Sequence, residues 1–148
     1  MPTESPGAAA ALTVLAEIKA IDQLAHLHLQ RALPDELEVS HYSVLNQLGR
    51  LGGERTPAQL ARAFRVTKGA MTNTIARLQR ADLVAVREDT EDRRKKLVSI
   101  TPRGAEMRRA ATASAAPLFD DIAGQLGRDR LAAALPLLRD LRQLLSER

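Results

Sequence analysis

The sequence predicts a mainly α-helical protein with one small β-hairpin. Over most of the 148 residues, apolar side chains recur at spacings of three and four, which is typical of amphipathic helices. Two short segments, 83–87 and 96–100, contain β-branched residues and suit a pair of strands. The stretch between them, 88–95, has no apolar residue and suits an exposed loop. These observations indicate a helical protein into which a single hairpin is inserted.

The N-terminal part is expected to form a flexible tail, residues 1–7, followed by a long helix and its turn, residues 8–36. Apolar residues from Leu12 to Leu29 keep the helical spacing, and Leu33-Pro34 ends it because proline disfavours helix in the residue before it. The start lacks the basic segment of a secretory signal, and no apolar run approaches the roughly 20 residues that cross a bilayer. We therefore expect a cytoplasmic protein with no membrane contact.

Residues 37–101 are expected to form one lobe that begins with three helices. Ser40 is the expected N-cap of the first, and Gly52-Gly53 its stop. Thr56-Pro57-Ala58-Gln59 has the composition of a capping box with proline at the first helical position, and Thr67 is the expected cap of the next helix, to about Arg80. The expected inward residues of the three helices are Val44, Leu45, Leu48 and Leu51, then Leu60, Ala61 and Phe64, then Met71, Ile75 and Leu78.

The helices that begin after Thr56 and Thr67, with a tight turn between them, form a helix-turn-helix. The hairpin that follows is the wing of a winged helix-turn-helix. Residues 102–148 are then expected to be two further helices, the first opened by Thr101-Pro102. Pro117 and Pro136 are expected to kink or interrupt this region. Its last part carries an apolar stripe of Leu131, Leu135, Leu138, Leu141 and Leu145.

Composition excludes several functions. The absence of cysteine excludes disulfides, thiolate zinc sites and thiol redox sensing. There is no HExxH motif, nucleophile elbow or glycine-rich phosphate loop, so we expect no enzyme and no cofactor. His26 and His28 fall on opposite sides of a helix, so no metal site is expected. With three aromatic residues the chain offers few stacking platforms for single-stranded nucleic acid, and a net charge of +4 proves no polyanionic partner.

The helix after Thr67 has a composition suited to the major groove of duplex DNA. Its polar side presents short and forked donors that match base edges, whereas its other side is apolar. The candidate major-groove residues are Thr67, Lys68, Gly69, Thr72, Asn73 and Arg77. Candidates for backbone contacts are Thr56, Gln59 and Arg80, and Arg77 is also placed for phosphate or intramolecular pairing. The alternative is an ordinary solvated helix face.

The hairpin loop supplies a second group of candidate DNA contacts. Arginine at the end of a projecting loop can enter the narrow, electronegative minor groove, and a nearby carboxylate can orient the guanidinium. Asp92, Arg93, Arg94 and Lys95 are the candidates for this role. The alternative is a solvated, charged turn.

The run from Leu45 to Gly104 resembles the MarR family of bacterial regulators. The matching pieces are TPAQLARAF from Thr56, VTKGAMTNTIARLQRADLV from Val66, and EDTEDRRKKLVSITPRG from Glu88. The family's pattern of an acid, a spacer and an arginine in the wing falls on Asp92 and Arg94. Asp82 departs from the glycine common in the family, but aspartate tolerates the left-handed conformation.

The resemblance implies a homodimer in which the N- and C-terminal helices of two chains interdigitate, reading a near-palindromic operator, most simply as a repressor. It also implies a small aromatic or carboxylate effector bound between these helices and the DNA-binding lobe. His26, Leu29, His41 and Tyr42 are the candidate effector residues, and ordinary packing or hydrogen bonding is the alternative for each. The competing functional hypothesis is a winged-helix architectural or protein-interaction module without sequence specificity.

Overall fold

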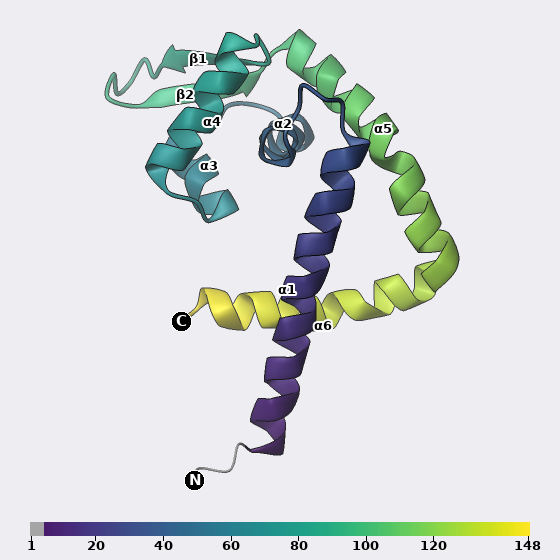
Figure 1. Ribbon diagram of the computed structural model, residues 1–148. Coiled ribbons are helices and arrows are strands. Elements are labelled where there is room, and N and C mark those ends of the chain that lie inside the picture. The colour runs from purple at the N-terminus through teal and green to yellow at the C-terminus, as the bar shows by residue number, and fades with distance from the viewer. Residues whose placement is uncertain (1–4) are drawn as a thin grey trace. The chain divides into compact units, whose positions relative to one another are not determined.

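The computed structural model describes residues 5–148 and contains six helices and one antiparallel hairpin over that range (Figure 1). The predicted fold class is confirmed. The elements in chain order are α1 (Pro6–Ala32), α2 (Val39–Leu51), α3 (Pro57–Phe64), α4 (Lys68–Arg80), β1 (Val84–Glu88), β2 (Lys96–Ile100), α5 (Pro102–Leu126) and α6 (Arg128–Ser146).

The chain divides into two compact units, Met1–Ser114 and Ala115–Arg148. The division falls inside α5 and not at residues 101 and 102, where the sequence pattern changes. The first turns of α5 therefore belong with the lobe that carries α2, α3, α4 and the hairpin. Ala111, on one of these turns, is fully buried in the same core.

Helix α1 begins earlier than the sequence predicts. The Ser5 side chain accepts a hydrogen bond from the backbone N–H of Ala8 at 3.1 Å, and Pro6 occupies the first helical position, which its fixed φ favours. The expected flexible tail 1–7 is thus wrong for Pro6 and Gly7, and its residues 1–4 lie outside the described residues. The predicted end of the helix before Leu33-Pro34 is confirmed.

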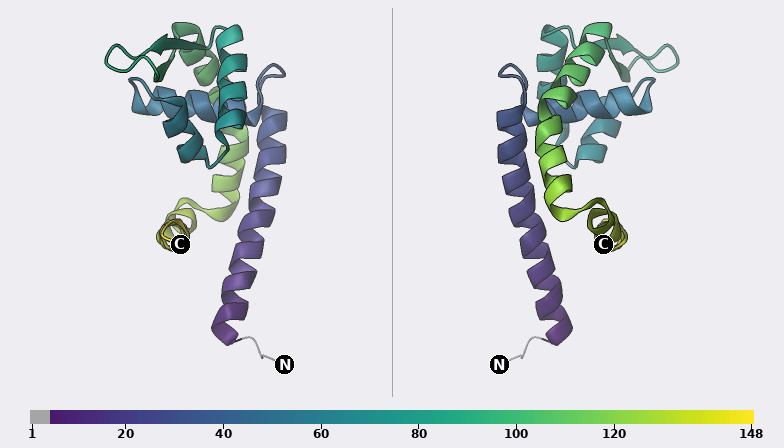
Figure 2. Two further views of the ribbon diagram at one scale, coloured as in Figure 1. Left: turned by 90° about the vertical axis from the view of Figure 1, so that its left-hand side faces the viewer. Right: turned by 90° about the vertical axis from the view of Figure 1, so that its right-hand side faces the viewer.

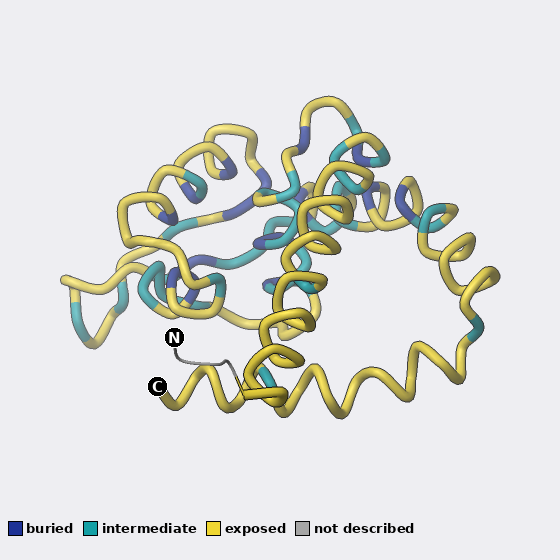
Figure 3. Tube along the Cα trace, turned by 60° about the horizontal axis from the view of Figure 1, so that its bottom comes forward, coloured by how far each residue is buried: buried dark blue, intermediate teal, exposed yellow. Residues whose placement is uncertain are grey.

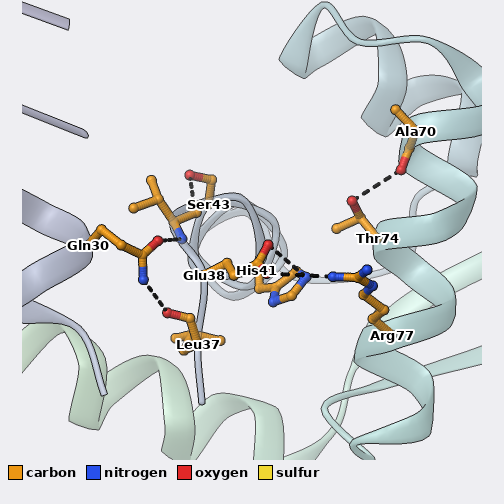
Figure 4. A network of polar contacts seen from close by, with 9 residues as sticks. Gln30, Leu37, Glu38, His41, Ser43, Ala70, Thr74 and Arg77 are labelled. Carbon is orange, nitrogen blue, oxygen red and sulfur yellow. Dashed lines mark hydrogen bonds and ion pairs between the residues drawn. The ribbon is translucent and has the colours of Figure 1, made fainter. Parts of the chain in front are cut away.

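The start of α2 is held by a side chain from α1 and not by Ser40. The helix begins at Val39, and the Gln30 side chain accepts a hydrogen bond from the Val39 N–H at 2.9 Å while it donates to the Leu37 carbonyl at 3.1 Å (Figure 4). This tertiary contact supplies a partner for an N–H that a local cap would otherwise satisfy. The predicted N-cap Ser40 is therefore wrong by position.

The helix-turn-helix forms as its local motifs predict. The Thr56 hydroxyl accepts from the Gln59 N–H at 3.1 Å, and the Gln59 side chain accepts from the Thr56 N–H at 2.9 Å, which completes the capping box of α3. The Thr67 hydroxyl caps α4 by accepting from the Ala70 N–H at 3.1 Å. Arg65 adopts a left-handed conformation between the two helices, with φ of 52°.

One hydrophobic core joins the helices of the lobe to the hairpin (Figure 3). The predicted inward residues are buried, except that Phe64 is half-buried and Leu51 is exposed. Leu51 is the last residue of α2, directly before Gly52 leaves the helical conformation, so its side chain lies beyond the packed turns. The buried apolar residues of this core are Leu33, Leu37, Val44, Leu45, Leu48, Leu60, Ala61, Met71, Ile75, Leu78, Leu83, Val84, Val98 and Ala111.

Strands β1 and β2 pair antiparallel with Val86 opposite Val98, and the loop before α3 extends the pairing. Arg55 exchanges two backbone hydrogen bonds with Val98, at 2.9 and 2.8 Å, on the free edge of β2. Beyond the hairpin, the Thr101 hydroxyl caps α5 by accepting from the Gly104 N–H at 2.9 Å. A side chain at Gly104 would collide with the Leu83 carbonyl, so this close approach requires glycine.

Helices α5 and α6 continue through their prolines, so an interruption there is wrong, while a kink stays a prediction. Pro117 and Pro136 both lie inside helices, and each is exposed, so carbonyls left without an N–H partner can bind water. The break comes at Gly127, whose φ of +88° a helix does not accommodate. No residue of α6 is buried, and its predicted apolar stripe is exposed apart from the half-buried Leu141.

Candidate nucleic-acid interface

Helix α4 presents one continuous exposed face. Lys68, Gly69, Thr72 and Asn73 are exposed, while Met71, Ile75 and Leu78 fix the opposite side in the core. The polar side predicted for contact with DNA therefore points away from the protein interior. Its role as a reading surface remains a prediction.

The side chains on this face differ in how free they are. The Thr72 hydroxyl donates to the Lys68 carbonyl at 2.8 Å, which leaves its methyl group as the part available to a partner. Within residues 5–148 the Asn73 amide makes no hydrogen bond, so its donor and acceptor remain available to a base edge. A Cβ built at Gly69 meets no atom within 4 Å, so nothing in the chain itself requires glycine there.

Arg77 is paired within the protein. Its guanidinium Nη1 lies 3.5 Å from Glu38 Oε1, and Glu38 Oε2 lies 3.8 Å from His41 Nε2 (Figure 4). One carboxylate before α2 thus faces a cation on α4 and an imidazole on α2. Burial lowers the pKa of His41, the Glu38 carboxylate opposes this shift, and the Arg77 charge adds to it. The net direction is downward, so burial outweighs the attraction to Glu38.

The expected backbone-contact residues also have partners within the chain. The Thr56 and Gln59 side chains bond the backbone at the start of α3, and Arg80 Nε donates to the Ala76 carbonyl at 3.4 Å. The Thr67 hydroxyl is occupied by the Ala70 N–H. Any contact that these residues make with DNA would have to use their remaining donors.

In the wing, one carboxylate orders the whole of Arg94. Asp92 Oδ1 accepts from the backbone N–H and from Nε of Arg94, each at 3.1 Å, and Oδ2 accepts from Nη2 at 3.3 Å. The Arg94 side-chain hydrogen bond, followed by the backbone one, lowers the pKa of Asp92. The Arg94 side chain is nonetheless 90% exposed. It is therefore oriented and still accessible.

The rest of the loop is ordered by its own turns. The Asp89 side chain accepts from the Glu91 N–H at 3.0 Å, and the Lys95 N–H donates to the Asp92 carbonyl at 2.9 Å. Arg93 and Lys95 are exposed beside Arg94. Figure 2 shows this loop extending past the helices of the lobe. The arrangement presents three cations on a defined, projecting turn.

The candidate effector residues are only partly brought together. His41 and Tyr42 are consecutive residues of α2, and Tyr42 and Leu29 both pack against the core, whereas His26 is exposed on α1. The Tyr42 hydroxyl lies 3.0 Å from the Thr112 hydroxyl on α5. Tyr42 is thus packed near the start of its helix and also hydrogen-bonded, and a ligand role for these residues remains a prediction.

Two further properties concern the described part of the chain. Residues 5–148 contain no group of three or more histidine, cysteine or acidic side chains placed to hold a metal ion. None of the helices in this range combines the length and hydropathy of a membrane span.

Comparison with known proteins identifies the lobe. The model of the MarR family matches residues 35–95, which is the segment that contains α2, α3, α4 and the hairpin loop. Residues 35–95 therefore form a MarR-family domain. MarR-family proteins are transcription regulators and not enzymes.

Solved MarR-family structures share the fold over nearly their whole length. BldR, a transcriptional regulator from Sulfolobus solfataricus, is 23% identical, with a TM-score of 0.78 over 94% of this chain and 96% of that one. BpsR from Bordetella bronchiseptica is 26% identical, with a TM-score of 0.76 over 88% and 98%. MarR from E. coli is 22% identical, with a TM-score of 0.72 over 95% and 98%.

Sequence reasoning missed two acids that organise this MarR-type lobe. Glu38 holds Arg77, and Glu54 holds Arg87 on β1 through two hydrogen bonds to Oε1, at 3.1 and 3.0 Å. The paired residues lie 39 and 33 positions apart, and no local motif links them. Only the packing of α2 and its following loop against α4 and the hairpin brings them together.

Proposed function

We propose that the protein is a homodimeric regulator that binds a specific, near-palindromic site in double-stranded DNA. The observation that carries this proposal is the pairing of two exposed features on one lobe. The polar face of α4, with a free Asn73 amide, has the chemistry of a major-groove reader, and the Asp92-held Arg94 has that of a minor-groove contact.

The exposed apolar surface supports dimerisation. In α1 the exposed residues include Leu12, Ile21 and Leu24, at 57 to 61% exposure. Helix α6 exposes most of its leucine stripe. Large apolar side chains gathered on exposed helices mark contact sites, so a second copy is the simplest cover. Two-fold pairing would place the two α4 helices about one turn, roughly 34 Å, apart along DNA.

We also propose that a small aromatic or carboxylate effector controls DNA binding, and that the regulator acts as a repressor. Support comes from BpsR, which is 26% identical and whose structure concerns regulation of its DNA binding by 6-hydroxynicotinic acid. His41 and Tyr42 on α2 are the candidate contacts. Control requires that the effector bind the DNA-competent and DNA-incompetent states with different affinity.

The decisive experiment selects bound duplexes from a random pool with the purified full chain. We expect an enriched site with two related halves, preferred over random duplex on the order of thousandfold or more. If the dimer neutralises roughly six to ten phosphates, affinity should fall about 10³- to 10⁵-fold between roughly 50 and 200 mM salt. Binding with no enriched sequence would instead favour an architectural module. Repeating the selection with aromatic carboxylates tests the effector.

A further inference from the structure

An ion pair ties the base of the wing to the loop that leads into the helix-turn-helix. Arg87 on β1 donates from Nε and Nη2 to Glu54 Oε1, at 3.1 and 3.0 Å, and Nε also lies 3.0 Å from Oε2. Glu54 precedes Arg55, whose backbone N–H and carbonyl both hydrogen-bond to the backbone of Val98 on β2. The side-chain pair therefore spans from the loop across β2 to the outer strand of the hairpin.

The pair connects two regions that contact DNA under the proposed function. Thr56, two residues after Glu54, caps α3, and Glu88, one residue after Arg87, ends β1 where the wing loop begins. Arg87 Nη1 also donates to the Glu88 carbonyl at 3.2 Å. The pair is thus anchored at the strand end from which the Arg94 loop projects.

The exposure of the pair argues that its value is geometric. The Arg87 side chain is 52% exposed and that of Glu54 is 35% exposed. An ion pair in this much solvent contributes little to folding stability. Its forked contact does, however, fix the orientation of two side chains better than a single contact would. The ion pair therefore suits a role in orienting the wing, and folding does not require it.

We propose that Glu54 and Arg87 form a strap that sets the direction of the wing, so that Glu54 is a positioning residue for DNA binding through Arg94. The inference rests on the proposed function and goes beyond it in one respect. Glu54 carries a negative charge, and electrostatics alone predicts that removing it strengthens binding to DNA. The strap predicts the opposite.

The test measures the affinity of the full chain for its selected duplex with Glu54→Gln and with Glu88→Gln. Glu88 is a matched control because it lies next to Arg87 and its carboxylate has no ion pair in the described chain. We expect Glu54→Gln to weaken binding about three- to tenfold, as for residues coupled by contact. Glu88→Gln should bind as tightly as the unmodified protein or more tightly. Tighter binding by Glu54→Gln overturns the proposal.

A second variant shows whether Glu54 acts through the wing. In an Arg94→Ala background the wing has lost its inserting side chain, so Glu54→Gln should then cause no further loss. A loss that simply adds to that of Arg94→Ala overturns the proposal, because independent sites have additive effects.

A measurement without DNA separates failure of the strap from failure of the proposed function. Backbone order parameters of residues 89–95 should fall in Glu54→Gln and remain unchanged in Glu88→Gln. Unchanged order in both variants overturns the strap, whatever the protein binds. A lowered order in a protein that selects no duplex would support the strap as a mechanical element and refute both the DNA-binding proposal and the positioning role.

Discussion

The guanidinium of Arg77 on α4 lies 3.5 Å from the carboxylate of Glu38, the residue that precedes α2. The major-groove set predicted from sequence includes Arg77, but this contact gives it a partner inside the protein. The same carboxylate also faces His41, so the start of α2 and the last turn of α4 share one electrostatic cluster. The predictions below rest on this cluster, the α4 face, the close approach at Gly104, the wing and the apolar stripe of α6.

Folding stability should depend on the protonation of His41. Its pKa in the folded protein lies below the usual 6.5, mainly because of burial, so the unfolded chain takes up the proton first as the pH falls. The contribution of the neutral His41 imidazole to the free energy of unfolding is therefore complete above pH 6.5 and decreases below it. Urea unfolding from about pH 5 to about pH 8 should show this slope, and His41→Gln should reduce it. His26→Gln, at an exposed site, is the control; an unchanged slope in His41→Gln would contradict the assignment.

Replacing Asn73 with alanine should remove recognition of one base. We expect a cost of about 1 to 3 kcal/mol on the selected duplex and relaxed preference at a single position, because the amide would otherwise bond a base edge in two places. Competition binding with singly substituted duplexes measures both effects. Gln79→Ala removes an exposed amide elsewhere on α4 and should change neither. Unaltered selectivity in Asn73→Ala would exclude Asn73 as a reader.

Two glycines should respond oppositely to alanine. Gly69→Ala meets no atom in the protein and should keep or raise stability, by up to about 1 kcal/mol in a helix, yet weaken DNA binding by obstructing close approach. Gly104→Ala forces a Cβ against the Leu83 carbonyl and should lower the melting temperature strongly. Thermal melts and duplex titrations distinguish the two. Tight binding by Gly69→Ala would mean that DNA does not approach this turn.

Arg94→Ala should weaken binding to every duplex and change preference only modestly, at the flanking minor groove. The slope of log affinity against log salt should decrease by about one, as expected for the loss of one phosphate-neutralising cation. Arg31→Ala, a similar loss of charge in the last turn of α1, is the comparison. Wild-type affinity in Arg94→Ala would refute the role of the wing.

Leu138→Asp should prevent dimerisation without unfolding the chain. Leu138 is 42% exposed in the isolated subunit, so the substitution removes no buried contact there, whereas a charge in an apolar interface is costly. Light scattering should report a monomer, and affinity for the two-half site should fall. Ala133→Asp changes charge on the opposite side of α6 by helical spacing and should remain dimeric. Dimers in Leu138→Asp would move the interface elsewhere.

The elements that sequence predicts best are those fixed by neighbouring residues. Thr56 and Gln59 lie three positions apart, so their capping box is legible in the sequence and forms as expected. The α4 face follows from spacing alone. The cap of α2 comes instead from Gln30, nine positions before Val39, and a local rule therefore selects Ser40 wrongly.

Local capping and spacing rules predict neither long-range side-chain pairs nor whether a helix continues through a proline. The Glu38–Arg77 and Glu54–Arg87 contacts depend on how helices and hairpin pack, which composition does not encode locally. Pro117 and Pro136 carry a strong local signal for interruption, yet the chain tolerates them within helices. Sequence also pairs the wing arginine with Asp92, while the three donors of that contact, the Arg94 backbone N–H, Nε and Nη2, are known only from the folded turn.

Gln30 gives α1 a chain of polar contacts to α4. Its amide grips the backbone on both sides of Glu38, at Leu37 and Val39, and Glu38 in turn holds Arg77 (Figure 4). A sideways shift of α1 would therefore displace α4 through these successive polar contacts as well as through the hydrophobic core. A molecule that binds to α1 is thus coupled to the position of α4.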